Sequence, residues 1–209
     1  MNMKLTVPSS LDEISLSKYQ IYLKEFEKSK TEKNQETYLA LKIIEIFCEV
    51  SDEKAKLISQ TDANKVVNII LDLLSKEQQL VLSFQLNGIT FGWLPKLDDL
   101  QFGEFLDLNN NIDNFENIVV AMAVLYRPII EHTKEGKYKV ESYQGEKYHE
   151  VLKDMPMSAV LGATVFFWTL GMDLVTSTHK SLEQQLNKMS SQLKVNLLKN
   201  GDGLVPFQN

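Results

Sequence analysis

The residues in this sequence that are most able to do chemistry are three histidines and one cysteine. His132, His149 and His179 share no metal-ligand spacing with one another or with Cys48, so they do not indicate a zinc site. His149 and Glu150 are adjacent, and adjacent side chains point in different directions on a strand or a helix. We therefore expect ordinary surface histidines, with no metal ion and no catalytic histidine.

Two further stretches resemble fragments of known sites. Residues 107–111 (Asp-Leu-Asn-Asn-Asn) have the residue types that open an EF-hand calcium loop. Ile112 stands where that loop needs glycine and Ile118 where it needs a bidentate acid, so we expect a polar loop instead. In residues 126–128 an arginine follows a tyrosine at the end of an expected helix, where capping the helix is its expected role. With no glycine-rich phosphate loop, nucleophile elbow or cysteine pair, the sequence predicts neither an enzyme nor a cofactor.

The composition is that of an acidic globular chain. Hydrophobic residues make up 44% and charged residues 24% of the sequence, which is ordinary for a folded domain. The formal net charge of −6 argues against a dedicated nucleic-acid-binding protein, which normally carries a basic excess. The single Cys48 cannot form an intramolecular disulfide and fits a reducing compartment. Residues 1–10 contain one lysine and no long apolar run, so they do not predict a secretory signal.

One uncharged segment, residues 155–172, has nearly the length of a membrane-spanning helix. It contains Pro156 and Thr164, and Lys153 and Asp173 lie close to its ends. Charged residues at both ends and polar residues inside favour a buried core helix. We therefore expect no membrane contact.

A β-hairpin is the clearest local signal. Two β-prone runs, residues 81–86 and 89–94, are joined by Asn87-Gly88, and both turn residues tolerate the positive φ that a two-residue type I′ turn needs. Pro95 ends the second run because it cannot donate a hydrogen bond to a sheet.

The stretch that follows the hairpin repeats an earlier one. Residues 97–105 match residues 11–19 class by class, and each copy follows a β-prone run that ends in proline. Ser15 and Gln101 are the expected N-caps of equivalent helices, and Glu104 stands where a capping-box acid reaches back to the helix start. Each cap lies inside a hydrophobic staple, which pairs Ile14 with Tyr19 in the first copy and Leu100 with Phe105 in the second.

The remaining pattern extends this repeat to two halves. Short apolar helices are expected at residues 38–48 and 115–126, each at the centre of its half, and an amphipathic helix is expected from Thr61 or Asp62 to Leu74. Residues 3–7 are an expected strand. Residues 129–151 are an expected insert with strands at 137–143 and 146–149.

The sequence thus predicts a mainly helical α+β protein of two pseudo-repeated helical units, a small antiparallel hairpin sheet and a C-terminal amphipathic helix. The expected domains are residues 1–78, the first repeat; 79–178, the hairpin and second repeat, which share one core; and 179–209, the C-terminal helix and tail.

The C-terminal stretch is the expected partner-binding element. Its apolar residues recur every three or four positions and form one stripe of about four turns of helix: Leu182, Leu186, Met189, Leu193 and Leu197. An apolar stripe that contains methionine suits docking on another chain. Packing of the stripe on its own domain is the alternative.

Several stretches together resemble a family of tailed-bacteriophage morphogenesis proteins. They are the helix start at residues 11–16, the hairpin end Gly92-Trp93-Leu94-Pro95, the repeat at 97–108, and the segments 122–129 and 163–168. The resemblance covers residues 5–174 and is stronger in the second half. Members of this family resemble tail assembly chaperones and small virion structural proteins.

The resemblance implies a non-enzymatic protein that binds other phage virion or tail proteins, in the host cytoplasm during assembly or in the virion. It brings no catalytic, cofactor-binding or metal-binding residues. Homo-oligomerisation is compatible with it, whereas nucleic-acid and membrane partners are not expected. A generic interaction scaffold or adaptor is the alternative, and an enzyme whose site is built from scattered polar residues is the third hypothesis.

Overall fold

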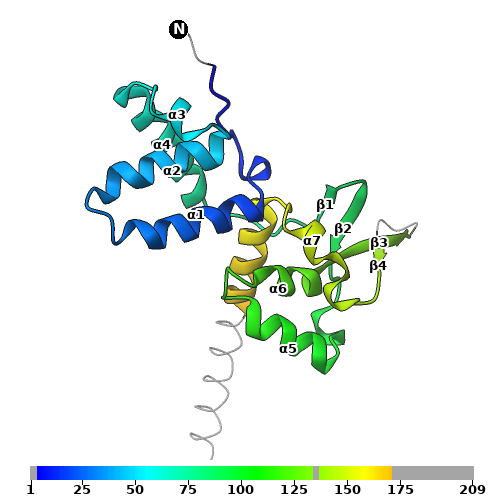
Figure 1. Cartoon of the computed structure of the whole chain (residues 1–209). Coiled ribbons are helices and arrows are strands. Elements are labelled where there is room, and N and C mark those ends of the chain that lie inside the picture. Colours follow the sequence, from blue (N-terminus) through cyan, green and yellow to red (C-terminus); the bar gives the residue numbers. More distant parts are fainter. Residues whose placement is uncertain (1–3, 134–136, 171–209) are drawn as a thin grey trace, which may run out of the picture. The chain divides into compact units, whose positions relative to one another are not determined.

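The computed structural model describes residues 4–133 and 137–170, in which helices accompany one antiparallel sheet (Figure 1). The chain divides into two units, Met1–Phe166 and Phe167–Asn209. All elements discussed below lie in the first unit, except the last turn of the final described helix. The expected α+β fold class is confirmed. The duplication of a whole helical unit and the domain borders stay predictions.

The first part of the described chain is helical. Its elements are η1 (Leu11–Glu13), α1 (Leu16–Ser29), α2 (Gln35–Cys48), α3 (Asp52–Ala55) and α4 (Gln60–Ser75). Helix α2 packs against α1, α3 and α4 and buries Ile43, Ile44 and Phe47. Apolar side chains surround most of its circumference, which explains its central place.

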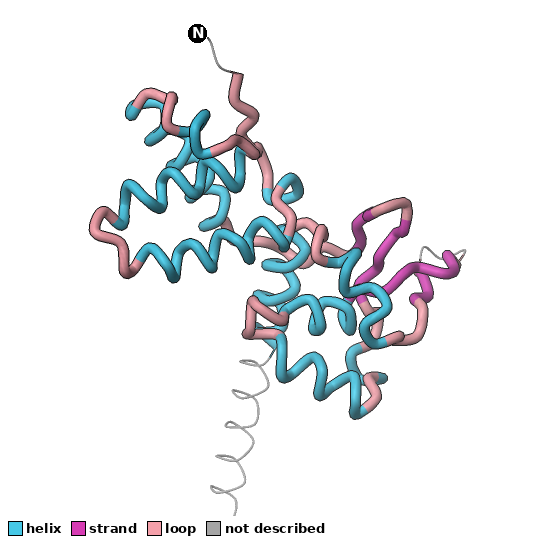
Figure 2. Tube along the Cα trace, viewed as in Figure 1, coloured by secondary structure: helices cyan, strands magenta, loops and turns pink. Residues whose placement is uncertain are grey.

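The second part of the described chain combines strands and helices. Its elements are β1 (Ser83–Leu86), β2 (Ile89–Trp93), η2 (Leu97–Asp99), α5 (Phe102–Asn111), α6 (Ile118–Leu125), β3 (Tyr126–His132), β4 (Tyr138–Val140), η3 (Gly145–Tyr148) and α7 (His149–Leu152). A helix over residues 157–170 follows. The four strands form one sheet in chain order, with every neighbouring pair antiparallel (Figure 2).

The predicted hairpin is confirmed. Leu86 pairs with Ile89 across the turn, and Asn87 and Gly88 have φ of 50° and 78°. Positive φ at both central residues is the geometry of a type I′ turn, whose twist matches that of the flanking strands.

Helix α6 runs directly into strand β3. Seven of its eight residues are buried, and Tyr126, its C-cap, already has extended backbone angles. The expected helix at 115–126 therefore exists but is shorter than predicted. Pro128 lies inside β3, paired with Phe91, and its carbonyl accepts a hydrogen bond from the Glu141 N–H at 2.8 Å.

Two glycines permit close approaches that no side chain would allow. A Cβ at Gly92 would come within 2.7 Å of the Tyr138 ring and 2.8 Å of the Ile129 side chain. A Cβ at Gly162 would come within 2.3 Å of the Gln79 carbonyl oxygen. Gly92 thus allows Tyr138 and Ile129 to pack directly on β2, and Gly162 allows the last helix to contact the backbone of residues 79–80.

The start of α1 is bound to a distant segment. The Ser15 side chain accepts a hydrogen bond from the Lys18 N–H at 3.3 Å, which confirms the predicted N-cap. The Leu16 N–H donates to the Met155 carbonyl at 2.9 Å, and Leu16 is fully buried. The Ser17 N–H donates to the Lys153 carbonyl at 2.7 Å. Two N–H groups that a helix start leaves without intrahelical partners are thereby satisfied.

Several expected elements were wrong. Residues 4–9 form no strand, because no strand lies beside them to accept their backbone hydrogen bonds. Residues 146–149 do not return as a strand but form η3 and the start of α7, and β4 pairs with β3 instead. The expected amphipathic helix is confirmed as α4, but its predicted start at Thr61 or Asp62 was wrong: it begins at Gln60, because Ser59 caps it by accepting a hydrogen bond from the Asp62 N–H at 3.2 Å.

None of the helices in residues 4–133 and 137–170 combines the length and the apolar character that crossing a lipid bilayer requires.

Candidate functional site

Helix α5 begins with the same backbone path as α1. A 3-10 turn precedes each helix, and the N-cap residues Ser15 and Gln101 have ψ of 154° and 155°. The Glu104 carboxylate accepts a hydrogen bond from the Gln101 N–H at 3.1 Å, which confirms its predicted capping role. The two matching sequence stretches therefore specify two matching helix starts.

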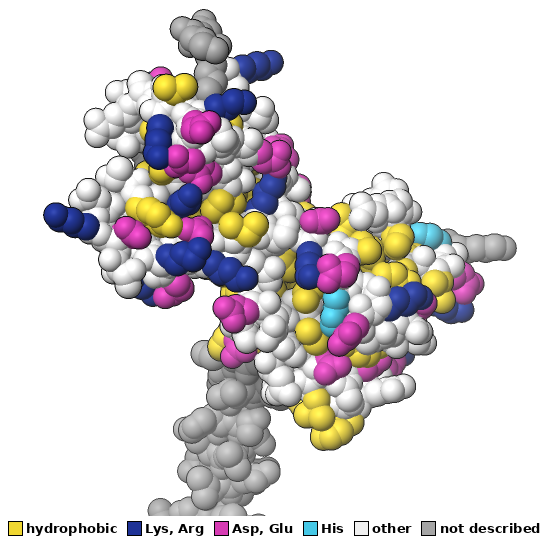
Figure 3. All heavy atoms as spheres, viewed as in Figure 1, with side chains coloured by type: hydrophobic (Ala, Val, Ile, Leu, Met, Phe, Trp, Pro, Cys, Tyr) yellow, Lys and Arg dark blue, Asp and Glu magenta, His cyan; other side chains and the backbone are white. Residues whose placement is uncertain are grey.

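The two faces of α5 have different surroundings. Leu108 is fully buried on the inner face, where the helix packs against α6. Phe102, Phe105 and Leu106 are 75%, 46% and 40% exposed, and spacings of three and four residues place them on one outer face. Figure 3 shows hydrophobic side chains over α5 on the viewed surface. We call these three residues the α5 apolar face.

A buried ion pair fixes the inner side of α5. The Glu104 carboxylate lies 3.2 Å from a terminal nitrogen of Arg127, and both side chains are about nine-tenths buried. The Arg127 Nε donates to the Val124 carbonyl at 2.9 Å, in the last turn of α6. The predicted helix-capping role of Arg127 is thus confirmed, and the same guanidinium joins the end of α6 to the start of α5.

A second polar contact lies one turn further along α5. The Tyr143 hydroxyl donates to the Asp107 carboxylate at 2.9 Å, and the Arg127 guanidinium lies 5.6 Å from the centre of the Tyr143 ring. Burial raises the pKa of Tyr143, and its hydrogen bond to Asp107 raises it further. The phenol therefore stays a neutral donor at physiological pH. With its acids and arginine already paired, this cluster positions the helix and offers no free nucleophile or base.

A groove of about 810 Å³ separates α1 from the α5–α6 connection. Lys24 and Lys28 line one side and Asp113 and Glu116 the other. The Gln20 amide spans it by donating to the carbonyls of residues 115 and 116, at 2.8 and 3.2 Å. Because the Gln20 amide joins its two walls, the groove lies along a contact between two elements and does not form an enclosed ligand pocket.

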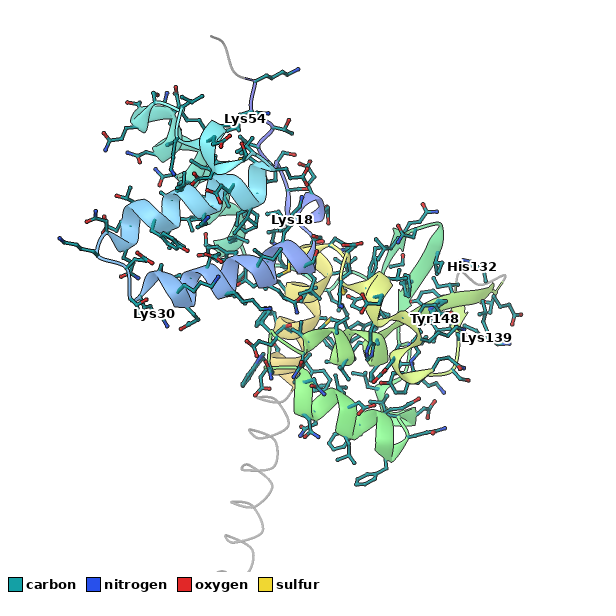
Figure 4. The ribbon with its side chains drawn as sticks, viewed as in Figure 1. Lys18, Lys30, Lys54, His132, Lys139 and Tyr148 are labelled. Carbon is teal, nitrogen blue, oxygen red and sulfur yellow. The ribbon has the colours of Figure 1, made fainter. Side chains whose placement is uncertain are left out.

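The residues with the most obvious chemistry do not converge. Strand β3 carries His132 (Figure 4), whose ring centre lies 6.4 Å from that of Tyr138. His149 begins α7. Within the described ranges, no three histidine, cysteine or acidic side chains are grouped as a metal site. Burial raises the pKa of the Cys48 thiol to about 11, so it is a poor nucleophile at neutral pH.

The expected polar loop at residues 107–111 was wrong, because these residues form the second half of α5. Leu108 explains the difference: it anchors a helical turn in the core, and the Asn111 side chain donates to the Asp107 carbonyl at 2.7 Å within the helix. The stripe Leu182, Leu186, Met189, Leu193 and Leu197 and the histidine at 179 lie outside the described residues.

The α5 apolar face was not among the predicted sites. Phe105 was expected to form a hydrophobic staple with Leu100, and Phe102 had no predicted role. The spacing of Phe102, Phe105 and Leu106 was the available signal. Leu108 is buried beside this face, where the helix packs against α6, so the three residues extend the apolar surface of α5 beyond the part that the core covers.

Comparison of the chain with protein-family models, curated proteins and solved structures gave no match.

Proposed function

We propose that the protein binds another protein through the α5 apolar face and acts without catalysis, as an assembly factor or structural component of a tailed-phage particle. One observation carries the binding role: Phe102, Phe105 and Leu106 are exposed side by side on a helix that is firmly held from behind. Scattered exposed apolar residues are normal, but a contiguous group on one rigid element is typical of an interaction site. The phage context rests on the resemblance of residues 5–174.

The rigidity of α5 favours binding over a purely structural role. Glu104 and Asp107 anchor the helix to residues from β3 and the segment after β4. A surface that is already ordered loses little conformational entropy when a partner binds. Two phenylalanines supply large contact areas at low entropic cost, as interface anchors do.

The test is a pair of variants compared in a phage infection or a reconstituted assembly. Phe102→Ser with Phe105→Ser removes the aromatic anchors, and Leu57→Ser is the matched control because Leu57 is 78% exposed elsewhere in the fold. We expect the double variant to fold normally by circular dichroism and to lose co-purification with virion proteins, whereas the control keeps it. Normal co-purification of the double variant would remove α5 from the binding role.

Mass spectrometry of purified particles separates the two phage roles. A structural component remains in the mature particle at a fixed copy number, whereas an assembly chaperone is present in infected cells and absent from particles. Absence of any association with virion proteins at either stage would overturn the phage assignment and favour a general adaptor.

A further inference from the structure

We propose that the partner segment that docks on the α5 apolar face is amphipathic and basic, with lysine or arginine flanking its apolar residues. This inference rests on the proposed binding function and specifies the chemistry of the partner. It follows from the charges on both sides of the helix in the sequence, which are predominantly acidic.

The sequence around α5 is strongly acidic. Residues 97–126 include six acidic residues and neither lysine nor arginine. Two of the six, Glu104 and Asp107, are held on the inner side by Arg127 and Tyr143. The other four lie before or after the helix and are exposed: Asp98, Asp99, Asp113 and Glu116.

These four acids are poorly neutralised by their own chain. Asp99 lies 3.7 Å from Lys96, a pair whose side chains are both more than 70% exposed and which therefore interact weakly. No ion pair within 4 Å involves Asp98, Asp113 or Glu116 in the described part of the chain, although Lys24 and Lys28 line the same groove as the last two. The apolar face thus has exposed acids at both of its ends, and the one ion pair among them in the described part of the chain is the weak one with Lys96.

Charge at the rim of an apolar contact selects the partner and accelerates encounter more than it adds affinity. A partner with acidic flanks would be repelled at both ends of α5, whereas a basic segment would be attracted. The ten residues of α5 span about 15 Å of helix, so a partner segment of three to four turns reaches from one acidic end to the other.

A second copy of this chain fits the face less well. Two-fold pairing of α5 with itself places the helices antiparallel or crossed and brings the acidic ends of both copies together. The net charge of −6 per chain adds repulsion. The observations therefore favour a basic partner over self-association.

The direct test uses two synthetic helical peptides of about 18 residues with identical leucine stripes. All charged positions outside the stripe are lysine in one peptide and glutamate in the other. Binding to the full-length protein is measured by fluorescence anisotropy at low and at high salt. We expect the lysine peptide to bind at least tenfold more tightly at low salt, with a preference that shrinks as salt rises.

Variants of the protein separate the contribution of the acids from that of the α5 apolar face. Asp98→Asn with Asp99→Asn should reduce the preference for the lysine peptide several-fold, while both peptides still bind through their leucine stripes. Glu53→Gln with Glu77→Gln neutralises two exposed acids elsewhere and should leave the preference unchanged. Phe102→Ser with Phe105→Ser should abolish binding of the lysine peptide.

The outcomes separate this inference from the proposed function. Equal binding of both peptides, lost in the phenylalanine variant, would keep α5 as the docking site and overturn the basic partner. Binding of the lysine peptide that survives the phenylalanine variant would overturn the docking site itself. If neither peptide binds, the proposal of a basic partner is overturned. It is also overturned if light scattering shows self-association that the phenylalanine variant abolishes.

Discussion

Leu16 and Phe102 are the first residues of α1 and α5, at matching positions of two matching helix starts, yet Leu16 is fully buried and Phe102 is 75% exposed. The segment from Lys153 to Pro156 covers the start of α1 and accepts hydrogen bonds from its backbone. No described segment does the same for α5. A local sequence pattern therefore sets where a helix begins, while a distant segment decides whether its first turn becomes core or binding surface.

The largest expected difference is between truncations at these two positions. Leu16→Ala should lower the free energy of unfolding by about 2–5 kcal/mol, because it leaves a cavity in the core. Phe102→Ala should change it by less than about 0.5 kcal/mol, because the side chain is already in water. Chemical denaturation followed by circular dichroism measures both. Similar losses of unfolding free energy for the two variants would mean that Phe102 is covered in solution and does not differ from Leu16 in burial.

The next comparison is between the third residues of the two helices. Glu104→Gln should cost about 1–3 kcal/mol of unfolding free energy, since it leaves the buried Arg127 without its counter-charge. Lys18→Gln breaks the pair of the half-buried Lys18 with the exposed Glu49 and should cost less than about 1 kcal/mol. The same denaturation assay applies. A loss at Lys18 as large as that at Glu104 would show that the two starts are anchored with equal strength.

The hairpin before α5 has no counterpart in the described residues 4–15 before α1, and its turn offers a further test. Gly88→Val should destabilise the protein by about 1 kcal/mol or more, because its φ of +78° strains a β-branched residue. Gly103→Ala is the control within α5: its Cβ meets no atom within 4 Å, and it should be neutral or stabilising by up to about 1 kcal/mol. Unchanged melting of the valine variant would remove the turn assignment.

The smallest expected effect lies just before α1. The Ser9 hydroxyl and N–H both donate to the Glu13 carboxylate, at 2.7 and 3.0 Å, and lower the pKa of Glu13 from 4.5. A lowered folded-state pKa stabilises the fold above the ordinary value and loses that stabilisation as the pH falls through the lowered one. Ser9→Ala should raise the pKa of Glu13 in an NMR titration. No change would show that the contact is not populated.

The elements that the sequence predicted correctly depend on neighbouring residues. Asn87-Gly88 defines a turn within two residues, and Ser15 and Glu104 cap helices within three or four. The wrong strands at 3–7 and 146–149 needed knowledge of distant pairing, since β-prone residues form strands only where a partner strand is available. The α5 apolar face escaped prediction for the same reason: Phe102 and Leu16 are both apolar first-turn residues, and their difference in burial comes from a segment about 140 residues from Leu16.

Tyr138 and Gly92 lead to an expectation about how this sequence can change. The Tyr138 ring lies over Gly92, and its hydroxyl donates to the carbonyls of Trp93 and Leu82, at 2.9 and 3.1 Å. One residue thus supplies the volume that the other gives up, and Tyr138 joins β4 to β2 and to the residue before β1. Substitution at either site alone should be harmful, so the two positions should vary together in evolution: a side chain at 92 should accompany a smaller residue at 138.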